Sequence, residues 1–254
     1  FHNLCTSIIN TNPEFFYNGA TLRAADDVTK YSVMEQIIEQ LPYDAKLRSY
    51  HPEQGYTYLK DVQKVISHIK KAGLTPQEFK NILDANDEDI IVLNEKLGPI
   101  LSKTVTQATY EEFCQAFAKL YKERGGKNIL AYHSLLDALY INFTTSVQEK
   151  KDLSPWKTTF TEKNTKGDLV FKDTRRADMM REVVTAYEKY SAAMFNQGYY
   201  DFDDMILDVL QAVQKHDVLR YKLQEQYQYI LVDEFQDTND AQMRLIWLLT
   251  NNEA

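Results

Sequence analysis

Two adjacent carboxylates, Asp233 and Glu234, are the residues of this chain whose type and position best suit catalysis. They follow the short apolar run 229–232, which predicts a strand buried on both faces of a parallel sheet. A carboxylate at the carboxyl end of such a strand lies where α/β sheets bind ligands. In nucleotide hydrolysis, one carboxylate there can hold Mg²⁺ and another can orient the attacking water or accept its proton. An acidic pair at a strand end can equally be a simple turn, so the pair alone leaves both interpretations open.

The residues after the pair make the pattern more specific. Residues 232–239 read Val-Asp-Glu-Phe-Gln-Asp-Thr-Asn and resemble motif II of the UvrD/Rep family of superfamily 1 helicases, which reads Asp-Glu-Phe/Tyr-Gln-Asp-Thr. Ala241, Gln242 and the apolar residues up to Leu249 are similar to the helix that follows motif II in that family. This resemblance favours the catalytic interpretation of the pair over that of a turn.

Two more segments resemble the same family in the same order. Residues 200–206, Tyr-Asp-Phe-Asp-Asp-Met-Ile, are similar to its Asp-Phe-x-Asp-Leu segment, which lies upstream of motif II. From the residues themselves we interpret this segment as structural, with Asp201 as a helix N-cap and Phe202 as a core anchor. Residues 1–5, Phe-His-Asn-Leu-Cys, resemble motif Ib, Thr-Phe-His-Ser, with Asn3 in place of the usual Ser.

The resemblance implies an α/β, predominantly helical fold: a partial RecA-like P-loop NTPase domain with an inserted helical domain. In this family two RecA-like domains, 1A and 2A, enclose ATP, and domain 1B is inserted in 1A and helps to form the path of the DNA. Residues 1–22 are then expected to be the N-terminal part of 1A, 23–197 domain 1B, and 198–254 the return to 1A. Residues 81–173 match no family motif, which leaves the subfamily open.

The resemblance also implies roles for four residues. Asp233 is expected to be the Mg²⁺ ligand, through bound ATP, and Glu234 the catalytic carboxylate that activates water. Gln236 lies where the family couples the nucleotide state to neighbouring motifs, and His2 matches a motif near the single-stranded DNA path. The expected cofactors are therefore ATP and Mg²⁺, and the expected partner is single-stranded or duplex DNA.

One half of the nucleotide site is missing from this sequence. It contains no Gly-x-x-x-x-Gly-Lys-Ser/Thr motif, the loop whose backbone N–H groups hold nucleotide phosphates. Motif III and the arginine finger of domain 2A are also missing. We therefore expect the chain to be a piece of a longer helicase, neither binding ATP and Mg²⁺ tightly nor hydrolysing ATP by itself.

Composition limits the alternatives. The chain has 254 residues, 44% of them hydrophobic, with 8 Gly and 6 Pro, which favours a folded protein of long helices. A net charge of −8 counts against a simple DNA-binding module, which would more often be basic. Cys5 and Cys114 have no metal-ligand spacing and favour a reducing, cytoplasmic location. No apolar run approaches the roughly 20 residues of a membrane span, so no membrane partner is expected.

Local signals predict several helix boundaries. Residues 59–69 carry an apolar helical face that Gly73 ends, and a long helix is expected over 177–196 with Gly198 after it. Capping boxes are predicted at three pairs, namely Ser32 with Glu35, Thr75 with Glu78, and Thr109 with Glu112. The polar, basic stretch 150–176 predicts an exposed loop or hairpin, which is either a solvated face or a surface that follows a nucleic-acid backbone.

Three functions remain open at this point. The first is part of an ATP-dependent 3′→5′ DNA helicase. The second is a non-catalytic DNA-binding or interaction module whose motif II is vestigial. The third is the helicase subunit of a helicase–nuclease of the RecB/AddA kind. A phosphate-binding lysine upstream favours the first and third, and a nuclease domain downstream selects the third.

Overall fold

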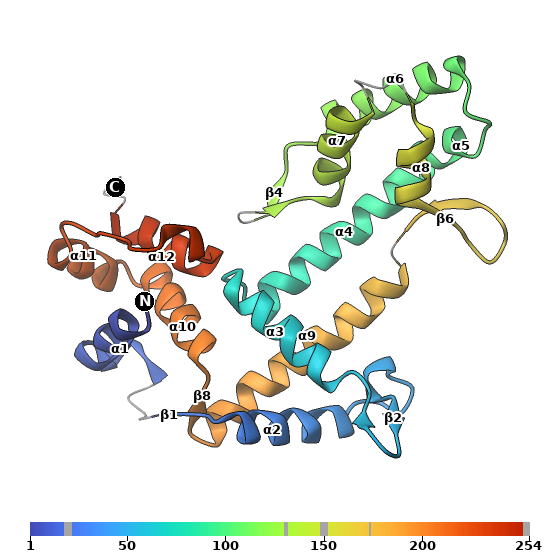
Figure 1. Ribbon diagram of the computed structural model, residues 1–254. Coiled ribbons are helices and arrows are strands. Elements are labelled where there is room, and N and C mark those ends of the chain that lie inside the picture. Colours follow the sequence, from blue (N-terminus) through green and yellow to red (C-terminus); the bar gives the residue numbers. More distant parts are fainter. Residues whose placement is uncertain (18–21, 130–131, 148–151, 173, 251–254) are drawn as a thin grey trace. The chain divides into compact units, whose positions relative to one another are not determined.

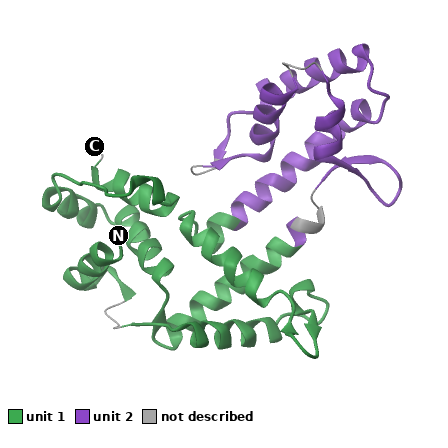
Figure 2. Ribbon diagram, in the orientation of Figure 1, with its two compact units in different colours: residues 1–79, 179–254 green, residues 80–178 purple. Residues whose placement is uncertain are grey.

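The computed structural model describes residues 1–17, 22–129, 132–147, 152–172 and 174–250 (Figure 1). Helices dominate, and the strands of the described part form short two-stranded sheets, so the predicted class, α/β and predominantly helical, is confirmed. The chain divides into two compact units (Figure 2). Unit 1 comprises Phe1–Phe79 and Met179–Ala254, and unit 2 comprises Lys80–Asp178. The stretch 81–173, which matched no motif, therefore falls within unit 2.

Unit 1 is built around the helix α10 (Phe202–Lys215), whose buried residues form one apolar face. This helix contacts α1 (His2–Thr11), α3 (Leu59–Lys71), α11 (Asp217–Gln226) and α12 (Asp240–Thr250). The unit also contains α2 (Asp27–Glu39), part of α4 (Pro76–Lys96), most of α9 (Thr174–Asn196), and the 3₁₀ helices η1 (Pro13–Phe15), η3 (Lys46–Arg48) and η4 (Phe235–Asp237). Its strands pair as β1 (Arg23–Ala24) parallel to β8 (Tyr199–Tyr200), and β2 (Tyr50–His51) antiparallel to β3 (Gly55–Tyr56).

Unit 2 has an aromatic core of its own. Its elements are the rest of α4 with α5 (Gly98–Leu101), α6 (Gln107–Arg124), α7 (Leu135–Ser146), α8 (Ser154–Phe160), β4 (Asn128–Ile129), β5 (Tyr132–His133), β6 (Thr161–Lys163) and β7 (Leu169–Phe171). The rings of Phe113, Phe117, Phe143 and Trp156 lie 5.4–5.9 Å apart, mostly edge to face or tilted, and all four side chains are buried. Such pairs stabilise a core beyond the area that they bury. Among the described residues, no helix is both long and apolar enough to cross a membrane.

Several of the predicted helix boundaries and caps are confirmed. Thr75 and Glu78 form the predicted reciprocal capping box, and Asp201 caps α10 as predicted, with Asp204 as its partner. Gly73 follows α3 with a φ of 73°, which a glycine adopts at no steric cost. The helix α9 spans the predicted 177–196 and begins slightly earlier, and the basic stretch contains the predicted hairpin, β6–β7, together with α8.

Two predicted capping boxes were wrong. The helix α2 begins at Asp27, where the side chain of Asp26 accepts a hydrogen bond from Thr29 N, so Ser32 lies inside the helix. The helix α6 begins earlier than expected because Thr106, not Thr109, provides the cap. In both cases a stronger cap upstream lengthens the helix at its N-terminus.

The predicted buried strand over 229–232 was also wrong. These residues adopt no strand pairing, and Tyr229 and Leu231 are 92% and 99% exposed. A strand is stable only when a neighbour accepts and donates its backbone hydrogen bonds. In the part of the chain that the structure describes, the only parallel pairing is β1 with β8, so the expected parallel sheet containing 229–232 is not formed.

Candidate active site

The structure brings Asp233, Glu234 and Gln236 together at the surface of unit 1. Asp233 Oδ1 accepts a hydrogen bond from Glu234 N at 3.0 Å, and Gln236 Nε2 donates to Glu234 Oε2. Glu234 adopts left-handed backbone angles, φ 50° and ψ 47°, which cost of order 1–3 kcal/mol in a residue other than glycine. Such strain concentrates at functional sites. All three side chains are exposed and face solvent.

The residues after the pair attach it firmly to the core of the unit. The 3₁₀ helix η4 is followed by Thr238, whose hydroxyl donates to Phe235 O at 2.8 Å. Asn239 and Gln242 then cap α12 reciprocally: Asn239 N donates to Gln242 Oε1 at 3.0 Å, and Gln242 N donates to Asn239 Oδ1 at 2.9 Å. The buried face of α12 packs on α10, so the carboxylate pair is held from its C-terminal side.

The donor set suits a magnesium–nucleotide complex better than a metal site built from protein ligands alone. Within the described ranges, no group of three or more His, Cys, Asp or Glu residues could hold a metal ion. Mg²⁺ is commonly held by one or two carboxylates together with substrate phosphates and waters. The exposed carboxylate of Asp233 is consistent with that arrangement, and the exposed carboxylate of Glu234 follows it directly in the chain.

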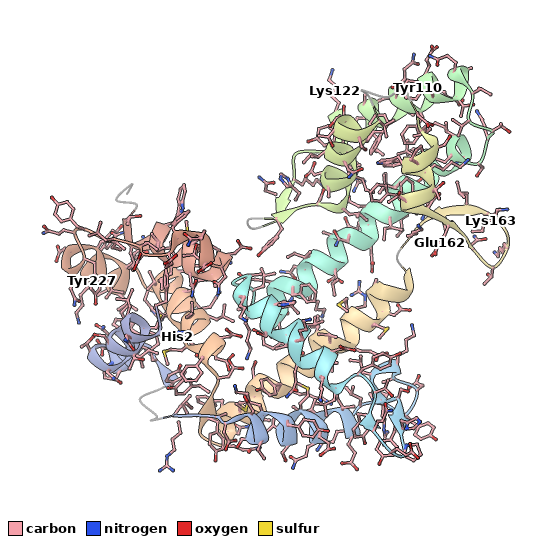
Figure 3. The ribbon with its side chains drawn as sticks, viewed as in Figure 1. His2, Tyr110, Lys122, Glu162, Lys163 and Tyr227 are labelled. Carbon is pink, nitrogen blue, oxygen red and sulfur yellow. The ribbon has the colours of Figure 1, made fainter. Side chains whose placement is uncertain are left out.

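His2, the fourth predicted residue, is the first residue of α1 (Figure 3), and its ring contacts that of Phe202, the first residue of α10. Its ring centroid is 5.5 Å from that of Phe202, with the two planes at 83°. Phe202 is 51% exposed, so the prediction that it anchors the core was wrong. Met205, Ile206 and Val209 of the same helix are buried. Burial of that first turn depends on the tertiary structure, which the sequence pattern does not contain.

A groove connects these segments, which are far apart in the sequence. It has a volume of about 470 Å³ and is lined by His2, Lys71, Phe202, Asp203, Ile206, Asn239 and Gln242. The start of α1, the end of α3, the first turn of α10 and the cap of α12 therefore meet at one place. Three of these segments carry the motifs identified in the sequence, and the groove is where they converge.

A buried ion pair that the sequence did not predict supports the first turn of α10. Lys70 Nζ lies 2.7 Å from Asp201 Oδ2 and 2.5 Å from Asp204 Oδ1, and the lysine side chain is fully buried. Burial by itself lowers the pKa of Lys70, but the two carboxylates outweigh it and hold the pKa above its ordinary value. The amine also lies over the rings of Tyr187 and Tyr190. Lys70 therefore joins α3 and α9 to α10.

A third carboxylate, Asp208, lies one turn further along α10. Tyr17 OH donates a hydrogen bond to Asp208 Oδ2 at 2.8 Å. Burial, followed by the nearby charge of Asp204, raises the pKa of Asp208 to about 7. Burial therefore brings the pKa of Asp208 close to neutral pH.

The sequence of this chain is similar to a known protein family and to several known proteins. The family model described as UvrD/REP helicase N-terminal domain matches residues 1–254. An ATP-dependent DNA helicase Rep from Buchnera aphidicola subsp. Acyrthosiphon pisum is 26% identical over 202 residues, which are 78% of this chain and 26% of that protein. An ATP-dependent DNA helicase Rep from Salmonella typhimurium is 41% identical over 68 residues, which are 27% of this chain and 10% of that protein.

An ATP-dependent DNA helicase PcrA from Staphylococcus epidermidis is similar as well. It is 40% identical over 70 residues, which are 27% of this chain and 10% of that protein. The matched regions are therefore 10% to 26% of the length of these relatives.

Proposed function

Because the chain belongs to the UvrD/REP helicase N-terminal domain family, we propose that it acts as part of an ATP-dependent DNA helicase. The helicase would move 3′→5′ on single-stranded DNA and unwind duplexes. The observation that carries the proposal is the linked trio of Asp233, Glu234 and Gln236, held in a segment that resembles motif II. The relatives that are ATP-dependent DNA helicases support the same activity.

Each member of the trio has a distinct role in this proposal. Bound ATP with Mg²⁺ would supply the phosphoryl group and neutralise its charge. Asp233 would hold the metal through its exposed carboxylate, and Glu234 would orient a water molecule and accept its proton. Gln236 donates a hydrogen bond to Glu234, so the position of its side chain depends on that of the proposed catalytic carboxylate. This hydrogen bond supports its role in coupling the nucleotide state to the rest of the domain.

The domain scheme of the family is part of the proposal. Residues 1–22 and 198–254 would form the RecA-like domain 1A, and 23–197 the inserted domain 1B. One apolar cluster supports this division, because all its buried members come from the two ends of the chain: Cys5, Ile8, Phe16, Met205, Ile206, Leu207, Val209, Leu210, Ala212, Val213, Leu219, Leu223, Ala241, Leu245 and Leu249. Segments separated by the whole middle of the chain thus share a core.

The proposed partners are ATP and single-stranded or duplex DNA, in the cytoplasm. The cysteines at 5 and 114 are free thiols, which agrees with a reducing location. The chain by itself is proposed to be inactive as an ATPase, because its sequence contains no phosphate-binding loop. Catalysis of phosphoryl transfer depends on positioning the phosphates and stabilising their charge, which the described carboxylates cannot do alone.

The test uses the full protein that contains this chain and duplexes with a single-stranded tail at either the 3′ or the 5′ end. Unwinding of the 3′-tailed duplex that requires both ATP and Mg²⁺ supports the proposal. Unwinding from the 5′ tail alone would overturn the direction of movement. ATP-dependent degradation of the DNA would select the RecB/AddA-like helicase–nuclease, and DNA binding without any ATP hydrolysis would select the non-catalytic module.

A further inference from the structure

We propose that Arg244 is a positioning residue for ATP hydrolysis. It holds α12, and through α12 the pair Asp233 and Glu234, against the carboxyl end of α3. The inference rests on the proposed function, because it presumes that the pair is catalytic. It deepens that function by naming a side chain, outside the segment that resembles motif II, that determines where the two carboxylates lie.

The side chain of Arg244 binds a backbone carbonyl of a segment that is distant in the sequence. Its Nη1 atom donates to Gly73 O, with 2.6 Å between the atoms and 171 positions between the residues. Gly73 follows the last turn of α3 and is buried, so its carbonyl needs a partner inside the protein. A cation at the carboxyl end of a helix is also favoured by the helix dipole. The contact therefore joins α12 to α3 by a charge-assisted hydrogen bond.

The turn between α3 and α4 is itself held in place. Gly73 N donates to Lys70 O at 2.8 Å and Leu74 N donates to Ile69 O at 3.1 Å, which are the two hydrogen bonds of a Schellman motif. The hydroxyl of Tyr187, on α9, donates to Leu74 O at 3.2 Å. The helix α4 begins directly after this turn and continues into unit 2 (Figure 2). The carbonyl that α12 contacts is therefore a fixed point of unit 1.

The end of α3 and the first turns of α12 are in close contact at Gly73. A Cβ atom there would lie 2.9 Å from Arg244 Nη1, 3.2 Å from Ala241 Cα and 3.2 Å from Leu210 Cδ2. Ala241 and Leu210 are buried, so neither has open space to move into. Packing therefore prevents α12 from moving toward α3, and the hydrogen bond of Arg244 opposes movement away from it.

Short-range hydrogen bonds connect α12 to the carboxylate pair. Arg244 lies one turn after the start of α12, whose cap is the reciprocal pair of Asn239 and Gln242. In η4, just before this cap, Asp237 N donates to Glu234 O at 2.9 Å. Each of these links spans three residues, so a shift of α12 is passed on to Glu234. A displacement of about 1 Å at a reacting group can lower a rate by about 10²-fold, which makes this position matter for catalysis.

The experiment measures kcat and KM for DNA-stimulated ATP hydrolysis by the full protein. Arg244→Ala should lower kcat by about 10- to 100-fold, the scale for a misplaced reacting group, and leave KM for ATP within about twofold. KM should hold because the loop that binds nucleotide phosphates is not part of the displaced segment. Arg244→Lys should retain most of the turnover, because an ammonium group can donate to the same carbonyl. Arg220→Ala is the matched control, since Arg220 is a half-buried arginine whose ion pair with Asp217 lies within α11, and it should not change kcat.

A second pair of variants tests the contact from the side of α3. Gly73→Ala places a methyl group against Arg244 and Ala241, so it should displace α12 and lower kcat as Arg244→Ala does. The double variant should be no slower than the slower single variant, because both changes remove the same contact. Gly198→Ala is the control: Gly198 follows α9 with a φ of 78°, but a Cβ atom there meets nothing within 4 Å. It carries the backbone strain without the collision, so it should leave kcat unchanged.

Amide hydrogen exchange of residues 234–242 in the full protein gives a measurement that does not depend on activity. Arg244→Ala should speed exchange in this segment, because the first turns of α12 lose their attachment to α3. Arg244→Lys and Arg220→Ala should exchange like the wild type. Thermal melting of each variant establishes that it is folded, so that faster exchange reports on the segment.

Four results would overturn the positioning role of Arg244. They are wild-type exchange over 234–242 in Arg244→Ala, an unchanged kcat in that variant, a raised KM with an unchanged kcat, and an equal fall of kcat in Arg244→Ala and Arg220→Ala. Each of them leaves the proposed helicase function standing as long as the wild type hydrolyses ATP and Glu234→Gln does not. Failure of the wild-type full protein to hydrolyse ATP would refute the proposed function and, with it, the role of Arg244 in hydrolysis.

Discussion

Lys70 and Asp201 form a buried ion pair, with 2.7 Å between Lys70 Nζ and Asp201 Oδ2. Asp201 is also the N-cap of α10, so one carboxylate both begins the central helix of unit 1 and neutralises a lysine of α3. The proposed catalytic carboxylates depend on this helix. Its first turn carries Phe202, and its buried face supports α12.

The first prediction concerns this ion pair. Lys70→Met should destabilise the chain by about 3–5 kcal/mol, because it leaves Asp201 and Asp204 buried without a cation. The measurement is urea unfolding followed by circular dichroism. Lys64→Met, on the exposed side of the same helix, is the matched control and should change the free energy of unfolding by less than about 0.5 kcal/mol. Equal stability of the two variants would show that the pair contributes little.

A second prediction follows from the raised pKa of Asp208. The pKa of Asp208 is about 7 in the folded chain, whereas the ordinary value for an aspartate is 3.8. The folded chain therefore binds the proton more tightly than the unfolded chain. The stability contributed by the protonated carboxyl is fully present below about pH 4 and is lost as the pH rises through about 7. Tyr17, Lys70, Asp201 and Asp204 are the titratable groups that act on it.

Asp208→Asn mimics the protonated carboxyl and should remove the dependence of stability on pH that Asp208 causes. The variant should be more stable than the wild type by about 1–3 kcal/mol at pH 8 and by a smaller amount at pH 5. Thermal melts at both pH values provide the measurement. Asp44→Asn, at an exposed position, should melt like the wild type at each pH. If the difference between Asp208→Asn and the wild type is the same at pH 5 and pH 8, Asp208 does not titrate in this range.

A third prediction tests the proposed base in the full helicase. Glu234→Gln should slow DNA-stimulated ATP hydrolysis by about 10²–10⁴-fold and leave nucleotide binding largely intact. The amide of the introduced glutamine is nearly isosteric with the carboxylate of Glu234, and its oxygen can still accept the hydrogen bond from Gln236. Unwinding should fail, and single-stranded DNA binding should persist. Glu225→Gln, an exposed substitution on α11, is the control, and normal turnover in Glu234→Gln would refute the catalytic role.

Asp233→Asn should behave differently from Glu234→Gln. It removes the proposed metal ligand, so the affinity for the Mg²⁺–nucleotide complex should fall together with turnover. Titration of a fluorescent ATP analogue, with and without Mg²⁺, separates the two variants. If both variants bind the nucleotide like the wild type in the presence of Mg²⁺, the assignment of Asp233 to the metal is wrong.

The last prediction is that the chain alone hydrolyses no ATP. The purified chain, with single-stranded DNA and Mg²⁺, should release phosphate no faster than its own Glu234→Gln variant. The reason is the missing phosphate-binding loop, without which the carboxylates have no phosphate to act on. Turnover that is stimulated by DNA and lost in Glu234→Gln would contradict it.

The sequence alone determined the features that arise within a few residues. The cap of α10 at Asp201 and the box of Thr75 with Glu78 are hydrogen bonds across one turn, so residue types and spacing were sufficient to predict them. The contacts among Asp233, Glu234 and Gln236 are equally local, and the resemblance to a helicase motif had already placed these residues together. Local hydrogen bonding depends on neighbours that the sequence itself supplies.

Only the tertiary structure decided the features that depend on distant neighbours. Residues 229–232 have the composition of a buried strand, but a strand needs a partner, and no described segment pairs with them. Phe202 is of a residue type that is usually buried, yet it is half exposed. Lys70 is of a residue type that is usually exposed, yet it is fully buried. Burial and charge pairing are set by segments that meet in space, and a pattern read along one helix does not contain them.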